Sequence, residues 1–417
     1  MQLKTILNHV HPFKSFVYGK ARWLEGAKRP TIEVEVLSRR NGRAICSGCE
    51  KPRPGYDHLP PRQFEFVPLW GIAVLFLYSM RRVQCPTCGV KVEKVPWSDG
   101  KNQLTIAYRW FLAGWAKRLS WQEVADAFST TWENVFRSVK HAVFWGIAHQ
   151  DLKDIEAIGV DEIQWQHGHN YLTLVYQIDN GMKRLLWIAR DRTEESLQGF
   201  FNVLTDDIRT GIRFVCSDMC KSYLNAIAKG LGGAVHVLDR FHIMKSMNEA
   251  IDAVRRSEVR RLEQNGKPAV LKHSRWCLLK RPENHSDRQA AKLAELVKLN
   301  LQCVRSHLMR EDFQQFWDYT TPGWAGRFLD QWCTRAMRSK IDPMKKVARS
   351  LRSHRELILN WFRAKGAISA GTVEGFNNKA KLTTRKAYGF RTYEGIQTAL
   401  YHALGDLPQP EFPHKFC

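Results

Sequence analysis

Alternating apolar and polar positions between residues 155 and 240 predict a mixed sheet. Three apolar segments separated by turn residues form its first part and are typical of an antiparallel meander: 155–165, 171–179 and 184–191. Helical and extended segments then alternate: a helix near 194–204, a strand over 212–218, a helix over 221–230 and a strand over 234–239. Because helices separate the last strands, those strands are expected to pair in parallel.

The most apolar run of the chain, Val67 to Met80, predicts a buried pair of strands. It is shorter than the about 18–20 residues that cross a bilayer, and it contains Pro68 and Gly71. The N-terminus has no apolar stretch of signal-peptide length. We therefore expect no membrane partner, no export or anchoring signal, and a cytoplasmic location.

Two short helices are predicted before the sheet. Ser120 and Thr130 are each followed three residues later by glutamate, which is the capping-box pattern of a helix start. Two helices joined by a tight turn resemble a helix-turn-helix, whose second helix would enter the major groove of DNA. Asn134, Arg137 and Lys140 would then lie on the DNA side of that helix. The alternative is a helical hairpin that binds nothing.

Net charge adds a partner class to this picture. Lys and Arg number 64 and Asp and Glu 41, so the formal net charge is +23. Such an excess favours a polyanionic partner, most simply nucleic acid, although a merely basic globular protein is the alternative. The composition, 44% hydrophobic and 25% charged, excludes collagen-like and wholly disordered chains.

Four cysteines form two C-x-x-C pairs, Cys46 with Cys49 and Cys85 with Cys88. Such a pair aims two thiolates at one ion, and two pairs supply the four soft ligands that tetrahedral Zn²⁺ prefers. The sequence therefore predicts a structural zinc site. Two unrelated reduced pairs, or redox dithiols, are the alternative.

Acidic residues inside the apolar strands suggest a second metal site. Asp161 and Asp218 lie within or at the end of strands, where a carboxylate is costly unless it is paired or bound to metal, and oxygen ligands suit Mg²⁺. Helix capping and surface ion pairs are the alternatives. Farther along, a helix would place Glu374, Asn378 and Lys381 on one face, which suits metal and phosphate but also an ordinary polar face.

The order of these motifs resembles that of bacterial insertion-sequence transposases of the ISL-three group. Several motifs carry the resemblance, which extends from about Cys46 to about Gly395: the two cysteine pairs, the two short helices, GVDE at 159–162, SDMCKSY at 217–223, VLDRFHIMKSMNEAIDAVRR at 237–256 and TVEGFNNKAK at 372–381. The resemblance implies a DDE recombinase with a ribonuclease H-like core.

The resemblance also implies roles for single residues. Asp161, Asp218 and Glu374 would be the catalytic triad that holds Mg²⁺ or Mn²⁺, with Asp161 as a ligand of both ions. His242, paired with Asp239, would lie near the scissile phosphate. Basic residues of the last helix are expected to contact DNA: Lys379, Lys381 and Arg385.

The function implied is transposition of an insertion sequence. The protein would bind terminal inverted repeats in double-stranded DNA, cut them in a metal-dependent step and join the ends to target DNA, as a homodimer in a synaptic complex associated with the nucleoid. A non-catalytic DNA-binding regulator, a domesticated copy or a structure-specific nuclease is the alternative.

The expected fold class is a multidomain α+β chain, because 417 residues exceed one ordinary core. The segments expected are a zinc-binding module (1–100), a helix-turn-helix domain (101–150), the first part of a ribonuclease H-like α/β core with a mixed sheet (151–245), a helical basic insertion (246–365), and the last helix of the core with a C-terminal tail (366–417).

Overall fold

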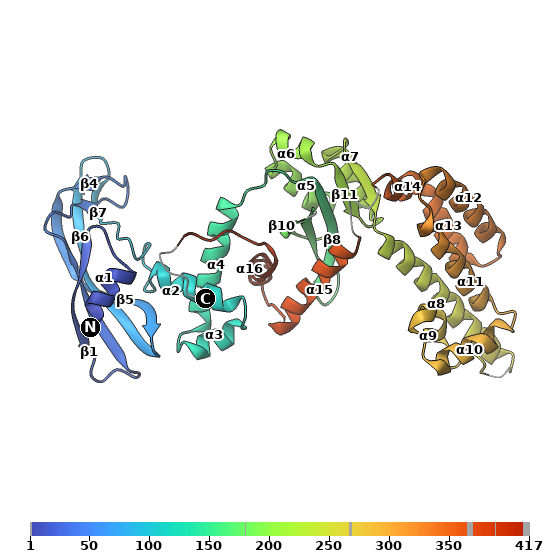
Figure 1. Cartoon of the computed structure of the whole chain (residues 1–417), viewed down its shortest axis with the longest axis horizontal. Helices are drawn as coiled ribbons and strands as arrows, with labels where there is room; N and C mark the ends of the chain where they lie inside the picture. Colours follow the sequence, from blue (N-terminus) through green and yellow to red (C-terminus); the bar gives the residue numbers. More distant parts are fainter. Residues whose placement is uncertain (1, 180, 267–268, 365–369, 388, 412–417) are drawn as a thin grey trace. The chain divides into compact units, whose positions relative to one another are not determined.

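The computed structural model describes residues 2–179, 181–266, 269–364, 370–387 and 389–411. The chain forms two compact units (Figure 1). One comprises Met1–Asp151 and Leu382–Cys417, and the other comprises Leu152–Lys381. Each unit is described by itself. Among the described residues, no helix combines the length and hydropathy that a membrane span requires.

The first unit begins with a short helix and a five-stranded sheet. Strands β1, β2, β6 and β5 pair in that order, and β7 pairs with β6. The bounds are α1 (Leu3–Val10), β1 (Phe16–Trp23), β2 (Thr31–Ser38), β5 (Gly55–Leu69), β6 (Ile72–Cys85) and β7 (Gly89–Val92), with a small ribbon of β3 (Ala44–Ile45) and β4 (Pro52–Arg53). The strand pair expected within the apolar run is confirmed: β5 and β6 form a hairpin whose turn residues, Trp70 and Gly71, both have positive φ.

Four helices complete this unit: α2 (Ile106–Ala116), α3 (Trp121–Ala127), α4 (Trp132–His149) and α16 (Tyr393–Leu404). The capping box expected at Ser120 is present. The second start was predicted one residue too early, because Thr131 is the N-cap and its hydroxyl accepts the N–H of Asn134. The hydroxyl of Thr130 instead accepts the side-chain amide of Asn134 at 3.1 Å.

The second unit is built on another five-stranded sheet, in the order β10-β9-β8-β11-β12. The predicted meander is confirmed, since β8, β9 and β10 pair antiparallel, whereas β11 and β12 join in parallel. The strands are β8 (Ala157–Gln166), β9 (Asn170–Ile178), β10 (Lys183–Arg190), β11 (Phe214–Ser217) and β12 (Val235–Leu238); the helices between them are α5 (Glu194–Val203), α6 (Asp206–Gly211) and α7 (Lys221–Gly230).

Both faces of this sheet are covered. On one face, Ile158 and Val160 of β8 belong to an apolar core that includes Phe200 of α5 and Tyr223 of α7. On the other face lies α15 (Ala370–Lys386), whose Phe376 ring stacks on Tyr176 of β9 at 4.7 Å between centroids. Alternate residues of β8 therefore point to different helices, and Asp161 lies on the side of α15.

The remainder of the second unit is helical and has its own core. Its elements are α8 (Arg240–Gln264), α9 (Arg275–Leu279), η1 (Pro282–Asn284), α10 (Asp287–Val297), α11 (Gln302–Gln314), η2 (Gln315–Asp318), α12 (Pro322–Arg338), α13 (Asp342–Ser353) and α14 (Arg355–Arg363). Phe313, Leu329 and Trp332 are buried at its centre. Asn360 of α14 donates a hydrogen bond to the carbonyl of His236 on β12 at 2.7 Å, which ties these helices to the edge of the sheet.

Candidate active site and cysteine cluster

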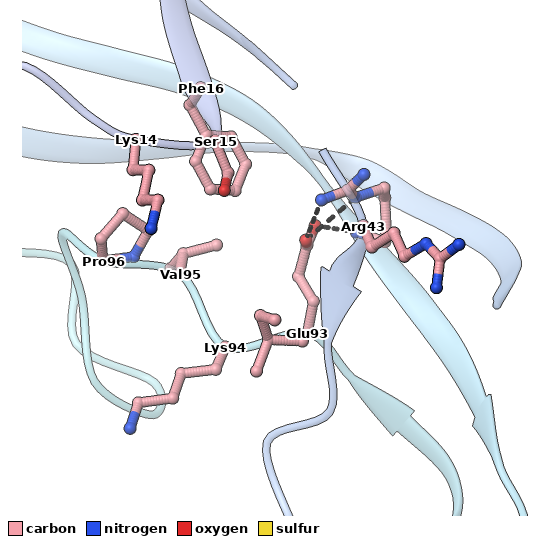
Figure 2. A pocket seen from close by; sticks show the side chains of 10 residues that line it. Lys14, Ser15, Phe16, Arg43, Glu93, Lys94, Val95 and Pro96 are labelled. Carbon is pink, nitrogen blue, oxygen red and sulfur yellow. Dashed lines mark hydrogen bonds and ion pairs between the residues drawn. The ribbon is translucent and has the colours of Figure 1, made fainter. Parts of the chain in front are cut away.

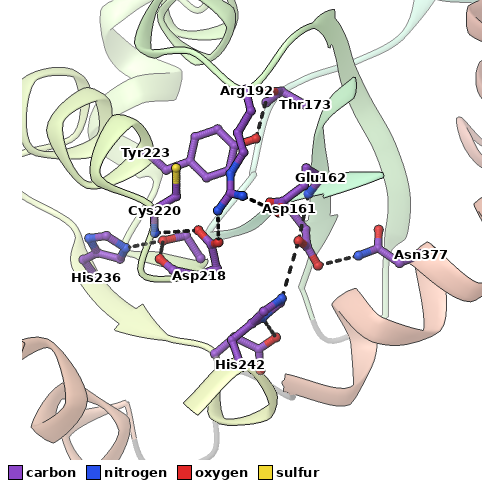
Figure 3. Close-up of polar contacts among 12 residues, drawn as sticks. Asp161, Glu162, Thr173, Arg192, Asp218, Cys220, Tyr223, His236, His242 and Asn377 are labelled. Atoms are coloured by element: carbon purple, nitrogen blue, oxygen red, sulfur yellow. Dashed lines mark hydrogen bonds and ion pairs between the residues drawn. The ribbon is translucent and has the colours of Figure 1, made fainter. Parts of the chain in front are cut away.

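Strand register places three aspartates at the same level of the second sheet. Gly159 of β8 pairs with Cys216 of β11, which puts Asp161 beside Asp218. Ser217 of β11 pairs with Leu238 of β12, which puts Asp218 beside Asp239. Strand pairing alone thus gathers three carboxylates, each buried to more than nine-tenths, at one region of the sheet. Figure 3 shows Asp161 and Asp218 there.

Asp161 is held on both of its oxygens. Oδ1 accepts the backbone N–H of Glu162 at 2.7 Å, and Oδ2 accepts the side-chain amide of Asn377. Burial raises the pKa of Asp161, and the nearby carboxylates add to that rise, while His242 opposes it. A buried carboxylate that resists ionisation in this way is stabilised by a cation.

His242 faces the same carboxylate. Its Nδ1 lies 3.0 Å from Oδ2 of Asp239, and its Nε2 lies 4.0 Å from Oδ1 of Asp161. Asp239 is also the N-cap of α8 and accepts the N–H of Phe241 at 2.9 Å. Burial disfavours the charged imidazolium, but the hydrogen bond to Asp239 and the charge of Asp161 outweigh it and raise the pKa of His242. The pairing of Asp239 with His242 expected from the sequence is present.

Glu162 and Arg192 belong to this cluster, although no role was predicted for either residue. The Arg192 guanidinium lies 3.0 Å from Glu162 and 2.7 Å from Oδ2 of Asp218. Within the part of the chain that the structure describes, Oε2 of Glu162 and Nε of Arg192 are buried without a hydrogen-bond partner. Glu162 stands in the GVDE motif and could have been noticed there, whereas Arg192 follows β10 in a segment without any motif.

The third expected carboxylate does not join the first two. Glu374, Asn378 and Lys381 share an exposed face of α15, as the spacing predicted. Among the described residues, the four cysteines are the only group of three or more side chains found close enough to hold a metal ion, so Asp161, Asp218 and Glu374 do not form a second such group. Asn377 is the residue of this helix that contacts Asp161.

The donor set nevertheless suits a divalent cation. Carboxylate oxygens are the ligands that Mg²⁺ and Mn²⁺ prefer. Two buried aspartates side by side, and an unpartnered Glu162 oxygen next to them, leave negative charge that Arg192 and His242 only partly balance. Asp161 and Asp218 are therefore the residues that could hold such an ion.

Replacing Gly159 with alanine is expected to loosen α15. A Cβ at Gly159 would lie 2.5 Å from Cγ2 of Val373, so the helix must move away from β8. We expect a loss of about 1–3 kcal/mol in the free energy of unfolding, measured by chemical denaturation. The matched control is Gly375→Ala on the same helix, where no heavy atom of the described residues would lie within 4 Å of the new Cβ. Equal stability of the two variants would contradict the close packing.

Glu162 is expected to make the stability of the metal-free protein depend on pH. Burial first, and then the charges of Asp218 and Asp161, raise its pKa from 4.5 to about 7. The folded state therefore holds this proton more tightly than the unfolded state does. The stabilisation that this bound proton gives to the folded state is fully present below pH about 4.5 and is lost as the pH rises through 7.

Glu162→Gln removes that titration. At 1.36 kcal/mol per unit of pKa, the free energy of unfolding of Glu162→Gln relative to that of the wild type should rise by roughly 3 kcal/mol between pH 4.5 and 8. Urea denaturation in magnesium-free buffer at several pH values measures it. Parallel stability curves for the two proteins would show that Glu162 is not buried among like charges.

The four predicted zinc ligands are gathered in the first unit. Their sulfur atoms lie within 4.8 Å of one another, and Sγ of Cys49 lies 3.6 Å from Sγ of Cys85. Four sulfurs at a Zn–S distance of about 2.3 Å are separated by about 3.8 Å, so the spacing fits a tetrahedral zinc. Gly48 is required here, because a Cβ would lie 2.9 Å from Sγ of Cys88. The cluster could hold a metal ion.

Ionisation of these thiols is also favoured locally. Desolvation opposes the thiolate of Cys85, but backbone N–H groups of Cys88 and Thr87 and the neighbouring thiols lower the pKa of Cys85 to about 6. The thiolate is the form that binds zinc. Part of the set is therefore ready for a metal at neutral pH.

A pocket of about 240 Å³ lies near the cysteine cluster, between the start of β1 and the segment after β7 (Figure 2). At its base, Arg81 forms a 2.7 Å ion pair with the buried Glu93. Exposed cations stand at its edge, and the lining is Lys14, Ser15, Phe16, Arg43, Ile45, Arg81, Glu93, Lys94, Val95 and Pro96.

The residues expected to bind DNA have varied surroundings. Asn134 contributes to the helix start described above, Arg137 pairs with Glu133 at 2.7 Å, and Lys140 pairs with Glu394 of α16. On α15, the expected residues are all exposed: Lys379, Lys381 and Arg385. Their binding to DNA stays a prediction.

Comparison with known proteins identifies the class. A family model described as a transposase, of the ISL3 (ISL-three) group, matches residues 158–400, more than half of the chain. The transposase for insertion sequence element IS1001 of Bordetella parapertussis is 29% identical over 354 residues, 84% of this chain and 86% of that protein. The transposase for insertion sequence element IS1557 of Mycobacterium tuberculosis is 29% identical over 392 residues, 87% of this chain and 86% of that protein.

The fold, the carboxylate cluster and these similarities together define an insertion-sequence transposase. The chain belongs to the ISL3 family, and the resemblance inferred from its motifs is confirmed.

Proposed function

We propose that this protein binds the terminal inverted repeats of its insertion sequence, cleaves them with a divalent metal and transfers the cut strands to target DNA. The second sheet is, in this proposal, a ribonuclease H-like core. The observation that carries the proposal is the strand register that brings Asp161, Asp218 and the Asp239–His242 pair together. Membership of a transposase family supports the same reaction.

Each residue of the site has a proposed task. Asp161 and Asp218 would hold Mg²⁺ or Mn²⁺, and Glu374, from the exposed face of α15, would reach the site to complete a DDE triad. When bound, such ions lower the pKa of an attacking water or 3′-hydroxyl and stabilise the leaving oxygen. His242, held by Asp239, would donate a hydrogen bond toward the scissile phosphate. Arg192 would neutralise Glu162 and Asp218 and so keep the carboxylates close together.

The first unit is the proposed DNA-binding part. Zinc at the four cysteines would fix the β3–β4 ribbon and the start of β7. The α3–α4 pair would act as a helix-turn-helix, with Asn134, Arg137 and Lys140 at the DNA. Contacts from exposed cations to phosphates explain the excess of +23 and would make binding sensitive to salt. Lys379, Lys381 and Arg385 would add contacts near the cut site.

The division of the chain into five segments remains part of this proposal. A synaptic homodimer is also part of it, because two transposon ends must be cut together. The bacterial cytoplasm, at the nucleoid, is the compartment in which this reaction would take place. A non-catalytic regulator that uses only the DNA-binding part is the second candidate, favoured by the exposed position of Glu374 on α15 while Asp161 and Asp218 are buried.

The test is a cleavage reaction with the full-length, zinc-loaded protein. An end-labelled duplex that carries the terminal repeat is incubated with Mg²⁺ or with Ca²⁺, and products are resolved on a sequencing gel. We expect nicks at the repeat end with Mg²⁺ and bound but uncut DNA with Ca²⁺. Bound DNA that stays intact under both conditions would favour the regulator.

A further inference from the structure

A line of three polar side chains connects strand β9, helix α15 and Asp161. Tyr176 Oη donates a hydrogen bond to Oδ1 of Asn377 at 3.0 Å. Nδ2 of Asn377 donates one to Oδ2 of Asp161 (Figure 3). The exposed fractions of the three residues are 0%, 8% and 5%. Because water cannot replace either partner at this depth, losing one hydrogen bond would leave a buried polar group unpaired.

The direction of these hydrogen bonds follows from chemistry. An ionised carboxylate only accepts, so Asn377 must turn its amide nitrogen to Asp161. Its oxygen is then left to accept from a donor, and the phenol of Tyr176 provides one. Burial raises the pKa of Tyr176 well above its ordinary value, so the phenol keeps its proton. Each partner thereby fixes the orientation of the next.

The result at Asp161 is a carboxylate fixed in its plane. The backbone N–H of Glu162 holds Oδ1 at 2.7 Å, and Asn377 holds Oδ2. A carboxylate has about four lone-pair positions, so two protein donors leave one free position on each oxygen. Those positions are the ones that a metal ion would use, and their direction is set by the two donors.

The same amide fixes helix α15 against the sheet. Val373 fills the space above Gly159, and Phe376 stacks on Tyr176. Asn377 is the polar member of this buried face, and it lies three residues after Glu374, so the two are neighbours on the helix surface. The position of Asn377 therefore also sets the place from which Glu374 extends.

We infer that Asn377, oriented by Tyr176, is a positioning residue that holds the Asp161 carboxylate in its metal-binding orientation and ties it to the helix that carries Glu374. The inference rests on the proposed function, since it requires Asp161 to be a metal ligand. Asn377 acts through Asp161, because its amide nitrogen is directed to Asp161 and its oxygen to Tyr176.

The test measures the affinity of the zinc-loaded, full-length protein for Mn²⁺ by electron paramagnetic resonance, without DNA. Tyr176→Phe removes only the phenol oxygen and keeps the stacked ring, and Asn377→Ala removes the amide. Loss of a partner that orients a metal ligand typically weakens metal binding by about 10–100-fold. We expect at least about tenfold weaker binding in Asn377→Ala and a smaller loss in Tyr176→Phe. The double variant should bind no more weakly than Asn377→Ala, since the phenol acts only through the amide.

Two further variants distinguish the positioning role of Asn377 from a general loss of stability and from an error in the metal assignment of Asp161. Leu329→Ala removes packing from the separate helical core and touches none of the three side chains, so it should lower the melting temperature and leave Mn²⁺ affinity within about twofold of the wild type, well below the effect of losing an orienting partner. Unchanged affinity in Asn377→Ala and Tyr176→Phe, while Asp161→Asn loses binding, would overturn the positioning role alone. Unchanged affinity in Asp161→Asn would overturn the metal assignment in the proposed function together with it.

Discussion

Asp161→Asn is expected to abolish end cleavage while leaving end binding intact. The substitution removes one carboxylate from the cluster, and the residues described for that cluster all belong to the second unit. We expect the cleavage rate to fall at least about a thousandfold, which corresponds to roughly 4 kcal/mol of transition-state stabilisation. Binding of the terminal-repeat duplex, measured by gel shift, should stay within about twofold, a change below 0.5 kcal/mol.

The stability of this variant provides an internal check. Burial and two neighbouring carboxylates raise the pKa of Asp161, so a neutral amide relieves repulsion that the wild type carries without metal. The same amide places an N–H group against either the Glu162 N–H or the Asn377 amide, which costs a buried hydrogen bond and offsets that relief. The variant should therefore stay folded in magnesium-free buffer, with a melting temperature close to that of the wild type. Asp207→Asn, an exposed aspartate of α6, is the matched control and should cut at the wild-type rate. A variant that loses binding or folding would place Asp161 in structure and not in chemistry.

Loss of zinc is expected to weaken end recognition without disturbing the second unit. The residues packed around the cysteines form a small buried cluster of Ala44, Cys46, Val83 and Cys85, which is too little apolar surface to hold the β3–β4 ribbon by itself. In small sites of this kind the metal supplies much of the folding free energy. Cys46→Ser combined with Cys49→Ser should therefore unfold this module locally.

The consequence for DNA should be large. We expect the double serine variant to lose its stoichiometric zinc and to bind the terminal repeat at least about tenfold more weakly, a loss of at least about 1.4 kcal/mol. Elemental analysis and nuclease footprinting measure the two effects. Cys277→Ser, a buried thiol outside the cluster, should keep its zinc and its footprint. An unchanged footprint after zinc loss would contradict a role of the module in end recognition.

The sequence predicted those parts of the site that depend on local pattern. Asp161 and Asp218 stood out because carboxylates are rare in apolar strands, and the sheet order then placed them side by side. The cysteine pairs were predictable from their short spacing. The Asp239–His242 motif was implied by the family resemblance, and the structure places the two side chains 3.0 Å apart. The strand hairpin after residue 54 followed from a continuous apolar run with a glycine turn.

The remainder depends on tertiary contacts that no local pattern encodes. Arg192 approaches Asp218 from the segment after β10, so its position could be known only from the folded sheet. On α15, the spacing correctly grouped Glu374 with Asn378, but it could not tell which face meets the sheet. That choice is made by the gap above Gly159, which admits Val373 and brings Asn377 to Asp161. The start of α4 differs from the prediction by one residue: Thr131 caps the helix, and Thr130 accepts the side-chain amide of Asn134.

The most direct measurement of the central claim is strand joining. A labelled duplex with a terminal repeat and a supercoiled target plasmid are incubated with the full-length protein and Mg²⁺, beside the Asp161→Asn variant. We predict that the wild type joins the 3′ end of the repeat covalently to the plasmid and that the variant joins none. Tight binding of the repeat by both proteins, with neither nicks nor joined product, would contradict the account and identify the chain as a DNA-binding regulator.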